Sequence, residues 1–177
     1  GTIAQNTADT AMMRMSLVTG SGTAEWTAIT VTKNGTLADS GVSTVKVYLD
    51  ANANNTFEPG SDTLVSPANN TFTAGAVNIT LSAAQTINTT PKVYFIVYSL
   101  AQFPTPGDTI GAEVTSNAHL TVTSPDVVAT TNFPLASTNA TVTDVADTLT
   151  VTPTALSPGS VQQSADYATQ KLSLAVN

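Results

Sequence analysis

Residues 45–62 read VKVYLDANANNTFEPGSD, a short alternating strand that runs directly into a loop rich in side-chain oxygens. In the strand part, Val45, Val47 and Leu49 alternate with Lys46 and Tyr48, which is the pattern of a strand with one buried face. The loop then places an Asp or Asn at every second position and adds two further acids before it ends. The stretch therefore predicts a β-strand followed by a loop that could surround a hard cation.

The spacing of the loop oxygens is typical of a calcium-binding loop, because calcium takes six to eight oxygens from carboxylates, amides and backbone carbonyls. The closing acid comes one place later than in the twelve-residue EF-hand loop. An Asx-rich turn without metal is the alternative, since Asn and Asp are favoured in turns for their own sake. The candidate ligands are the side chains of Asp50, Asn52 and Asn54, the backbone carbonyl of Thr56, Glu58 (directly or through water) and Asp62.

Two other loop residues carry structural expectations. Asn55 occupies the sixth position, where the chain turns sharply, and Asn tolerates positive φ better than most residues. Phe57 is expected to pin the loop to the core. If calcium binds, we expect it to serve as a permanent structural part. Extracellular modules bind calcium weakly, and their sites stay occupied because the calcium concentration around them is high.

The composition surrounding this loop favours an all-β protein outside the cell. Thr and Ser together number 48 of 177 residues, and β-branched Thr favours extended backbone. Charged residues make up 10% of the chain, well below the ~25% of ordinary soluble domains, and the net charge is −7. Such a surface repels a phosphate backbone, so we expect no nucleic-acid partner. Cysteine is absent and no long apolar run occurs, so we expect no disulfide and no membrane span.

In the rest of the chain, short alternating runs recur about every ten residues, and turn signals lie between them. Residues 93–98 read VYFIVY, apolar on both faces, which predicts a central strand covered on each side. Residues 82–85, the one short helical candidate, are expected to form no more than a turn. This spacing indicates a Greek-key β-sandwich rather than βαβ units.

The end of the chain echoes its beginning. Leu172-Ser173-Leu174 aligns with Met15-Ser16-Leu17 at a separation of 157 residues, and residues 161–166 align with residues 3–9 after a gap of one. A chance likeness of two Ser- and Ala-rich strands is the alternative. We therefore divide the chain into a sandwich over residues 1–150 and a linker with a C-terminal strand over residues 151–177. The predicted strand-donor interface is Lys171, Leu172, Ser173, Leu174, Ala175 and Val176.

Three motifs in order resemble a recurrent module. They are residues 22–27 (GTAEWT), residues 45–50 (VKVYLD) feeding the loop, and residues 85–87 (QTI) before residues 93–98. Together they resemble the calcium-loop Ig-like β-sandwich repeats of large secreted and cell-surface proteins of bacteria and archaea, over about residues 12–150. The resemblance implies an Ig-like fold, a structural calcium and a role in surface architecture or adhesion. It carries over Asp50, Asn52, Asn54 and Asp62 as ligands, and the family's usual Gly after the third ligand is Asn55 here.

These observations favour a structural subunit of an extracellular filament over an enzyme. A bare C-terminal strand that copies the first strand could add to the sheet of another copy, and such head-to-tail addition does not close. One alternative is a single repeat of a giant cell-surface adhesin, in which the echo begins the next repeat. A second alternative is a carbohydrate-binding accessory module of a secreted enzyme.

The sequence gives no catalytic set. His119 is the one histidine and lies beside an alternating strand, which favours a hydrogen-bonded structural role. Trp26 is interpreted as a core residue rather than a sugar-stacking platform. An internal isopeptide at Lys46 or Lys92 has no supporting pattern. Asn-x-Ser/Thr sequons that could carry glycans occur at Asn34, Asn54, Asn69, Asn78, Asn88 and Asn139.

Overall fold

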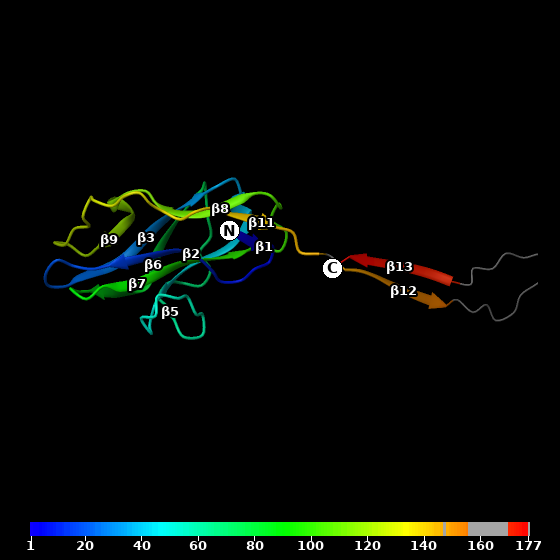
Figure 1. Cartoon of the computed structure of the whole chain (residues 1–177), viewed down its shortest axis with the longest axis horizontal. Helices are drawn as coiled ribbons and strands as arrows, with labels where there is room; N and C mark the ends of the chain where they lie inside the picture. The colour runs from blue at the N-terminus through cyan, green and yellow to red at the C-terminus, as the bar shows by residue number, and fades with distance from the viewer. Residues whose placement is uncertain (147, 156–169, 177) are drawn as a thin grey trace, which may run out of the picture. The chain divides into compact units, whose positions relative to one another are not determined.

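The computed structural model describes residues 1–146, 148–155 and 170–176. Within them the chain is all-β, with two short 3-10 turns and no α-helix. The chain divides into two compact units, Gly1–Asp144 and Val145–Asn177. Figure 1 draws the strands of the first unit in blue to yellow and those of the second in orange and red.

The larger sheet of the first unit has seven strands. β3 is its longest central member and pairs antiparallel with three other strands, so that it organises most of the sheet. The first strand pairs in parallel with the eleventh, which ties the beginning of the unit to its end. The order is β1 (Thr2–Ala4), β11 (Ala140–Thr143), β8 (Thr109–Val114), β3 (Ala24–Asn34) and β6 (Ala76–Ile87), with β9 (Leu120–Val122) paired to β3 and β10 (Leu135–Ala136) paired to β8.

The smaller sheet has four antiparallel strands. Their order is β2 (Thr10–Leu17), β7 (Lys92–Leu100), β4 (Val42–Leu49) and β5 (Thr63–Leu64). β2 therefore lies at one edge, where Met13 pairs with Ile96 and Met15 with Tyr94 of β7. On its other side, β2 has no strand partner in the described part of the chain.

One apolar cluster takes residues from both sheets, so the sheets pack face to face as in a sandwich. Trp26 and Ile29 of β3 belong to it, together with Tyr94, Ile96 and Tyr98 of β7. All five are at most 1% exposed. The prediction of an all-β, two-sheet protein is confirmed, and its core is assembled by the alternating faces of the strands.

β7 is covered on both faces, as its sequence predicted. Tyr94, Ile96 and Tyr98 face the cluster between the sheets, while Phe95 and Val97 form a second cluster with Tyr48. Because successive side chains of a strand point to opposite faces, the second cluster lies on the outer face of the smaller sheet. This outer cluster positions the oxygen-rich loop.

Residues 82–85 were expected to form a turn, and this expectation is wrong. They lie within the continuous strand β6, whose Gln85 pairs with Trp26 and whose Thr86 pairs with Glu25. β3 pairs with Thr80 and Gln85 on either side of a register shift, and the Ser82 amide donates a 2.9 Å hydrogen bond to the Val65 carbonyl. These long-range contacts outweigh the weak helical preference of the two alanines, because tertiary context commonly outweighs propensity.

The second unit contains a two-stranded antiparallel hairpin. β12 (Leu149–Ala155) pairs with β13 (Gln170–Val176) over seven residue pairs, from Leu149 opposite Val176 to Ala155 opposite Gln170. The C-terminal strand was expected to be bare. It instead pairs with β12, a strand of its own tail that was not expected from the sequence.

Candidate metal centre and tail hairpin

The loop of residues 50–62 closes the hairpin between β4 and β5. Tyr48 pairs with Leu64 and Leu49 with Thr63, so both ends of the loop are held together by strand pairing. At the start of the loop, the Asp50 amide also donates a 2.9 Å hydrogen bond to the carbonyl of Val93 on β7. The loop is thus anchored to two strands of the smaller sheet before its first candidate ligand is placed.

Two acids form the inner part of the loop. Asp50 is 6% exposed and Asp62 is 8% exposed. The Asp50 carboxylate accepts hydrogen bonds from the amides of Asn54 and Asn55, at 3.2 and 2.8 Å. In the described part of the chain neither acid forms an ion pair. Their charge is therefore offset by backbone dipoles alone, although a buried carboxylate is stable when paired or bound to a cation.

Asp62 joins the two ends of the loop. One of its oxygens accepts the Ala51 amide at 3.2 Å and the other accepts the Glu58 amide at 2.8 Å. Its own amide donates to the Glu58 carbonyl at 2.8 Å. A carboxylate oxygen has two lone-pair positions, so each oxygen of Asp50 and Asp62 keeps one for a further partner.

Glu58 gathers the two amide side chains. Its Oε2 accepts hydrogen bonds of 2.8 Å from the Nδ2 atoms of both Asn52 and Asn54. The Oδ1 of Asn54 in turn accepts the Thr56 amide at 2.8 Å. Hydrogen bonds that involve a side chain thus join all six predicted ligand residues in one network, in which Glu58 links the Asn side chains to Asp62.

The turn geometry agrees with the sequence expectation for Asn55, which has a φ of 64°. Ala53 also has positive φ, at 55°, and this was not expected of a residue with a Cβ. Two left-handed residues within three positions bend the backbone tightly around Asn54. The hydrogen bonds from the Asn54 and Asn55 amides to the Asp50 carboxylate offset the cost of this bend, and they form only because the backbone bends there.

Phe57 holds the loop against the outer face of the smaller sheet. Its ring contacts Tyr48 at a centroid distance of 5.0 Å and Phe95 at 5.6 Å, both in the outer cluster. Phe57 pins the loop to a cluster of buried residues, as expected, and this cluster lies on the outer face of the smaller sheet rather than between the sheets. Burial, with a contribution from Asp9, raises the pKa of the Tyr48 hydroxyl in this cluster.

We expect the Phe57→Ala variant to lose about 1–2 kcal/mol of unfolding free energy, since it removes a half-buried aromatic ring and two ring contacts. Urea denaturation measures the loss. The matched control is Phe103→Ala, because Phe103 is 69% exposed and its removal should change stability by less than about 0.5 kcal/mol. Equal stability of the two variants would contradict the anchoring role of Phe57.

The donor set fits a hard cation only when amide and carbonyl oxygens are included. Among the described residues, no three or more His, Cys, Asp and Glu gather closely enough to hold a metal by themselves. Asn52 and Asn54 present their Nδ2 atoms to Glu58, and a half-turn of each amide would present the oxygen instead. With those turns, the two buried carboxylates, the exposed Glu58 carboxylate, two amide oxygens and the Thr56 carbonyl would give the hard oxygen set that calcium prefers.

The predicted donor residues 171–176 all lie in β13, where Ser173 pairs with Thr152 and Leu174 with Val151. The part of the echo at residues 161–166 lies outside the described residues. β12 was missed even though Leu149, Val151 and the intervening Thr150 alternate clearly. The reason is Pro153, which reads as a strand breaker unless the strand is at an edge.

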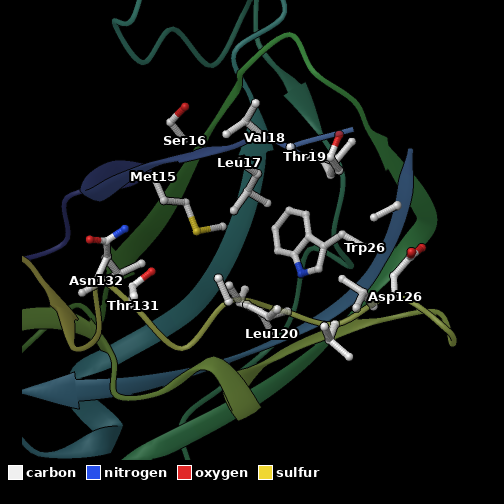
Figure 2. A pocket seen from close by; sticks show the side chains of 18 of the residues that line it. Met15, Ser16, Leu17, Val18, Thr19, Trp26, Leu120, Asp126, Thr131 and Asn132 are labelled. Atoms are coloured by element: carbon white, nitrogen blue, oxygen red, sulfur yellow. The ribbon is translucent and has the colours of Figure 1, made fainter. Parts of the chain in front are cut away.

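A groove beside β2 was also not predicted from the sequence. It is about 870 Å³ in volume and is lined by β2, by residues 125–136 and by Trp26 and Leu120 at its floor (Figure 2). Trp26 itself is 1% exposed, and its Nε1 donates a 2.8 Å hydrogen bond to the Ala28 carbonyl. The interpretation of Trp26 as a core residue is confirmed.

His119 lies in a short 3-10 turn, Asn117–His119, directly before β9 rather than within a strand. Its ring nitrogen Nδ1 is 3.2 Å from the Thr115 hydroxyl. The expectation of a hydrogen-bonded histidine is confirmed.

No helix in the described ranges has the length and hydrophobicity needed to cross a membrane. Comparison of the chain with protein-family models, with curated proteins and with solved structures gave no match.

Proposed function

We propose that this chain is a structural module of an extracellular assembly, in which the C-terminal tail of one copy joins the next copy by β-strand exchange. The observation that carries the proposal is the tail hairpin. Its strand β13 resembles part of β2, the edge strand of the smaller sheet, with Leu172-Ser173-Leu174 aligning with Met15-Ser16-Leu17. A tail that imitates a sheet edge suits a contact between copies, and such a head-to-tail contact builds a fibre.

The chain's surface chemistry supports this proposal. Natural proteins block exposed sheet edges with charge or proline to prevent pairing between molecules. The chain has five Lys and Arg in 177 residues, and Arg14 is the one basic residue in β2. An edge with so little charge is suited to pairing with another strand. The inert, Thr-rich and acidic composition also agrees with a location at the cell surface.

The proposed module is an Ig-like Greek-key sandwich stiffened by calcium. Asp50, Asn52, Asn54, Thr56, Glu58 and Asp62 would hold the ion, whose two positive charges would offset two of the three negative charges of the loop carboxylates. The ion would fix the loop, and through Phe57 the outer cluster, against the smaller sheet. Calcium is thus proposed as a permanent structural part rather than a signal.

A second candidate is one repeat of a giant surface adhesin, which the 157-residue spacing of the echo favours because it equals about one module. In that case the tail begins the next repeat and the joined copies belong to one polypeptide. The mass of the native polypeptide separates the two candidates. A product near 18.1 kDa favours a polymerising subunit, and one many times larger favours a repeat.

The experiment that tests the proposal removes the tail. The full chain should form concentration-dependent elongated oligomers, whereas a chain ending at Asp144 should remain monomeric. The shortened chain should stay folded, because every residue of the main apolar cluster lies within residues 1–142. Light scattering after size exclusion and negative-stain electron microscopy measure the assembly, and circular dichroism confirms the fold. Fibres of the shortened chain would contradict the proposal.

A further inference from the structure

The groove beside β2 combines unpaired backbone groups of an edge strand with apolar side chains at the same place. An edge strand presents N–H and C=O groups that lack partners in the sheet. Beside this edge, the side chains of Met15 and Leu17 point toward Trp26 and Leu120, whereas Ser16 and Val18 point away (Figure 2). An occupant that pairs with the first and covers the second is an added strand with apolar residues on one face.

The tail hairpin contains a pattern for such an occupant. β13 resembles β2 over a short stretch: basic Lys171 corresponds to Arg14, and Ser173 and Leu174 are identical to Ser16 and Leu17. β13 is already paired with β12 in a defined antiparallel register. A strand that pairs with the imitation should also pair with the original.

Transferring the register places each residue of β12 along β2. Val151, which is opposite Leu174 in the hairpin, would lie opposite Leu17. Thr152, which is opposite Ser173, would lie opposite Ser16. Because directly opposite residues of an antiparallel pair share a face, Val151 would enter the groove and Thr152 would face away.

The exposure of β12 agrees with this assignment. Val151 is 50% exposed and Leu149 is 58% exposed, and both lie on the face that would enter the groove. At ~25 cal/mol per Å² of buried apolar area, covering large aliphatic side chains of this kind favours docking. The groove volume of about 870 Å³ leaves room for several of them.

Pro153 makes the two partners of β12 mutually exclusive. Proline has no N–H, so within a sheet it is confined to positions where that group would face away from the paired strand. The edge of β12 that pairs with β13 is therefore the edge that can form a regular ladder, and its other edge is interrupted. β12 can pair with β13 or with β2, but through the same edge.

We propose that the groove beside β2 receives strand β12 of a second copy, antiparallel and with Thr152 opposite Ser16, and that β13 covers β12 until this exchange. The assignment rests on the proposed function and names the strand and the acceptor surface that it uses. In this assignment β13 occupies the pairing edge of β12 before the exchange, and β12 is the strand that docks.

Cysteine cross-linking tests the register, because the chain has no cysteine of its own. Ser16 and Thr152 are both exposed, and directly opposite residues have Cα separations that suit a disulfide. A mixture of the Ser16→Cys and Thr152→Cys chains should give a disulfide-linked pair under mild oxidation. The matched control mixes Thr152→Cys with Thr63→Cys, which places the thiol on the opposite edge strand β5, and should give no such pair.

A staple tests the exchange. The double variant Thr152→Cys/Ser173→Cys joins two opposite residues of the hairpin and locks β12 to β13. The oxidised form should lose self-association, and reduction should restore it.

The outcomes separate this assignment from the proposed function. If the stapled chain still assembles and the mixed chains do not cross-link, the assignment is overturned, while the requirement for the tail stands and β13 becomes the docked strand. If the disulfide forms within one chain carrying both cysteines but not between mixed chains, the groove takes its own tail and the second copy is overturned as occupant. If the unmodified full chain never assembles, the proposed function fails first.

Discussion

The Trp26→Ala variant is expected to lose about 3–5 kcal/mol of unfolding free energy, the usual range for removing a buried tryptophan from a core. Trp26 is 1% exposed and meets Tyr94 edge to face at a ring-centroid distance of 4.8 Å. It belongs to the cluster that joins the two sheets, so its removal opens a cavity between β3 and β7. Urea denaturation followed by far-ultraviolet circular dichroism measures the loss without needing the lost fluorophore.

The matched control is Trp26→Phe. It keeps an aromatic ring against Tyr94 but removes the Nε1–H that donates to the Ala28 carbonyl. Losing one such hydrogen bond costs about 0.5–1.5 kcal/mol, plus the smaller volume of the ring. A Trp26→Ala loss below about 1 kcal/mol would mean that the groove beside Trp26 already admits water and that the two sheets are held by other contacts.

The strand pattern of the smaller sheet could be predicted because burial there follows simple alternation. Residues 93–98 are apolar at every position, and the structure places them in β7 between two neighbours with a cluster on each face. Met13, Met15 and Leu17 alternate, and they form the edge strand β2 with one buried face. In both cases the side-chain pattern itself carries the information about which faces are covered.

Other elements depend on partners distant in sequence, and local pattern could not predict them. Residues 82–85 continue β6 because β3 pairs with Thr80 and Gln85 on either side of a register shift and the Val65 carbonyl accepts a hydrogen bond from the Ser82 amide. β12 contains Pro153, which local reasoning treats as a break unless the edge position is known. Phe57 packs on the outer cluster because of the side on which the loop leaves β4, and the sequence does not specify that side.

For the loop, the sequence predicted the participating residues better than their arrangement. The positive φ of Asn55 followed from its position, and the alternating Asx residues do converge. The burial of Asp50 and Asp62 could not be predicted, because it depends on the anchoring of the loop to Val93 and to the outer cluster. The bridging of both loop ends by Asp62 was equally invisible in the sequence.

Calcium is expected to raise the free energy of unfolding by about 2.7 kcal/mol when its free concentration is a hundred times the dissociation constant. The physical reason is that two buried carboxylates, Asp50 and Asp62, form no ion pair with the described residues and gain a cation in the folded state that the unfolded loop cannot hold. Chelation should remove the gain. Urea denaturation in calcium and in chelator measures the difference, and magnesium should give a smaller gain because it demands near-ideal octahedral geometry.

Variants identify the loop as the source of the gain. Asp62→Asn should lose most of the calcium-dependent difference, because it removes a buried negative charge while keeping a similar shape. The variant should also have a lower free energy of unfolding in chelator. Two backbone amides donate hydrogen bonds to the Asp62 carboxylate, and one of them loses its acceptor in the variant. The decisive quantity is therefore the difference between calcium and chelator within each variant. Asp126→Asn, an exposed acid outside the loop, should keep the full calcium gain. An equal gain in both variants would place the ion elsewhere, and no gain in the unmodified chain would leave the loop as an Asx-rich turn stabilised by its own backbone hydrogen bonds.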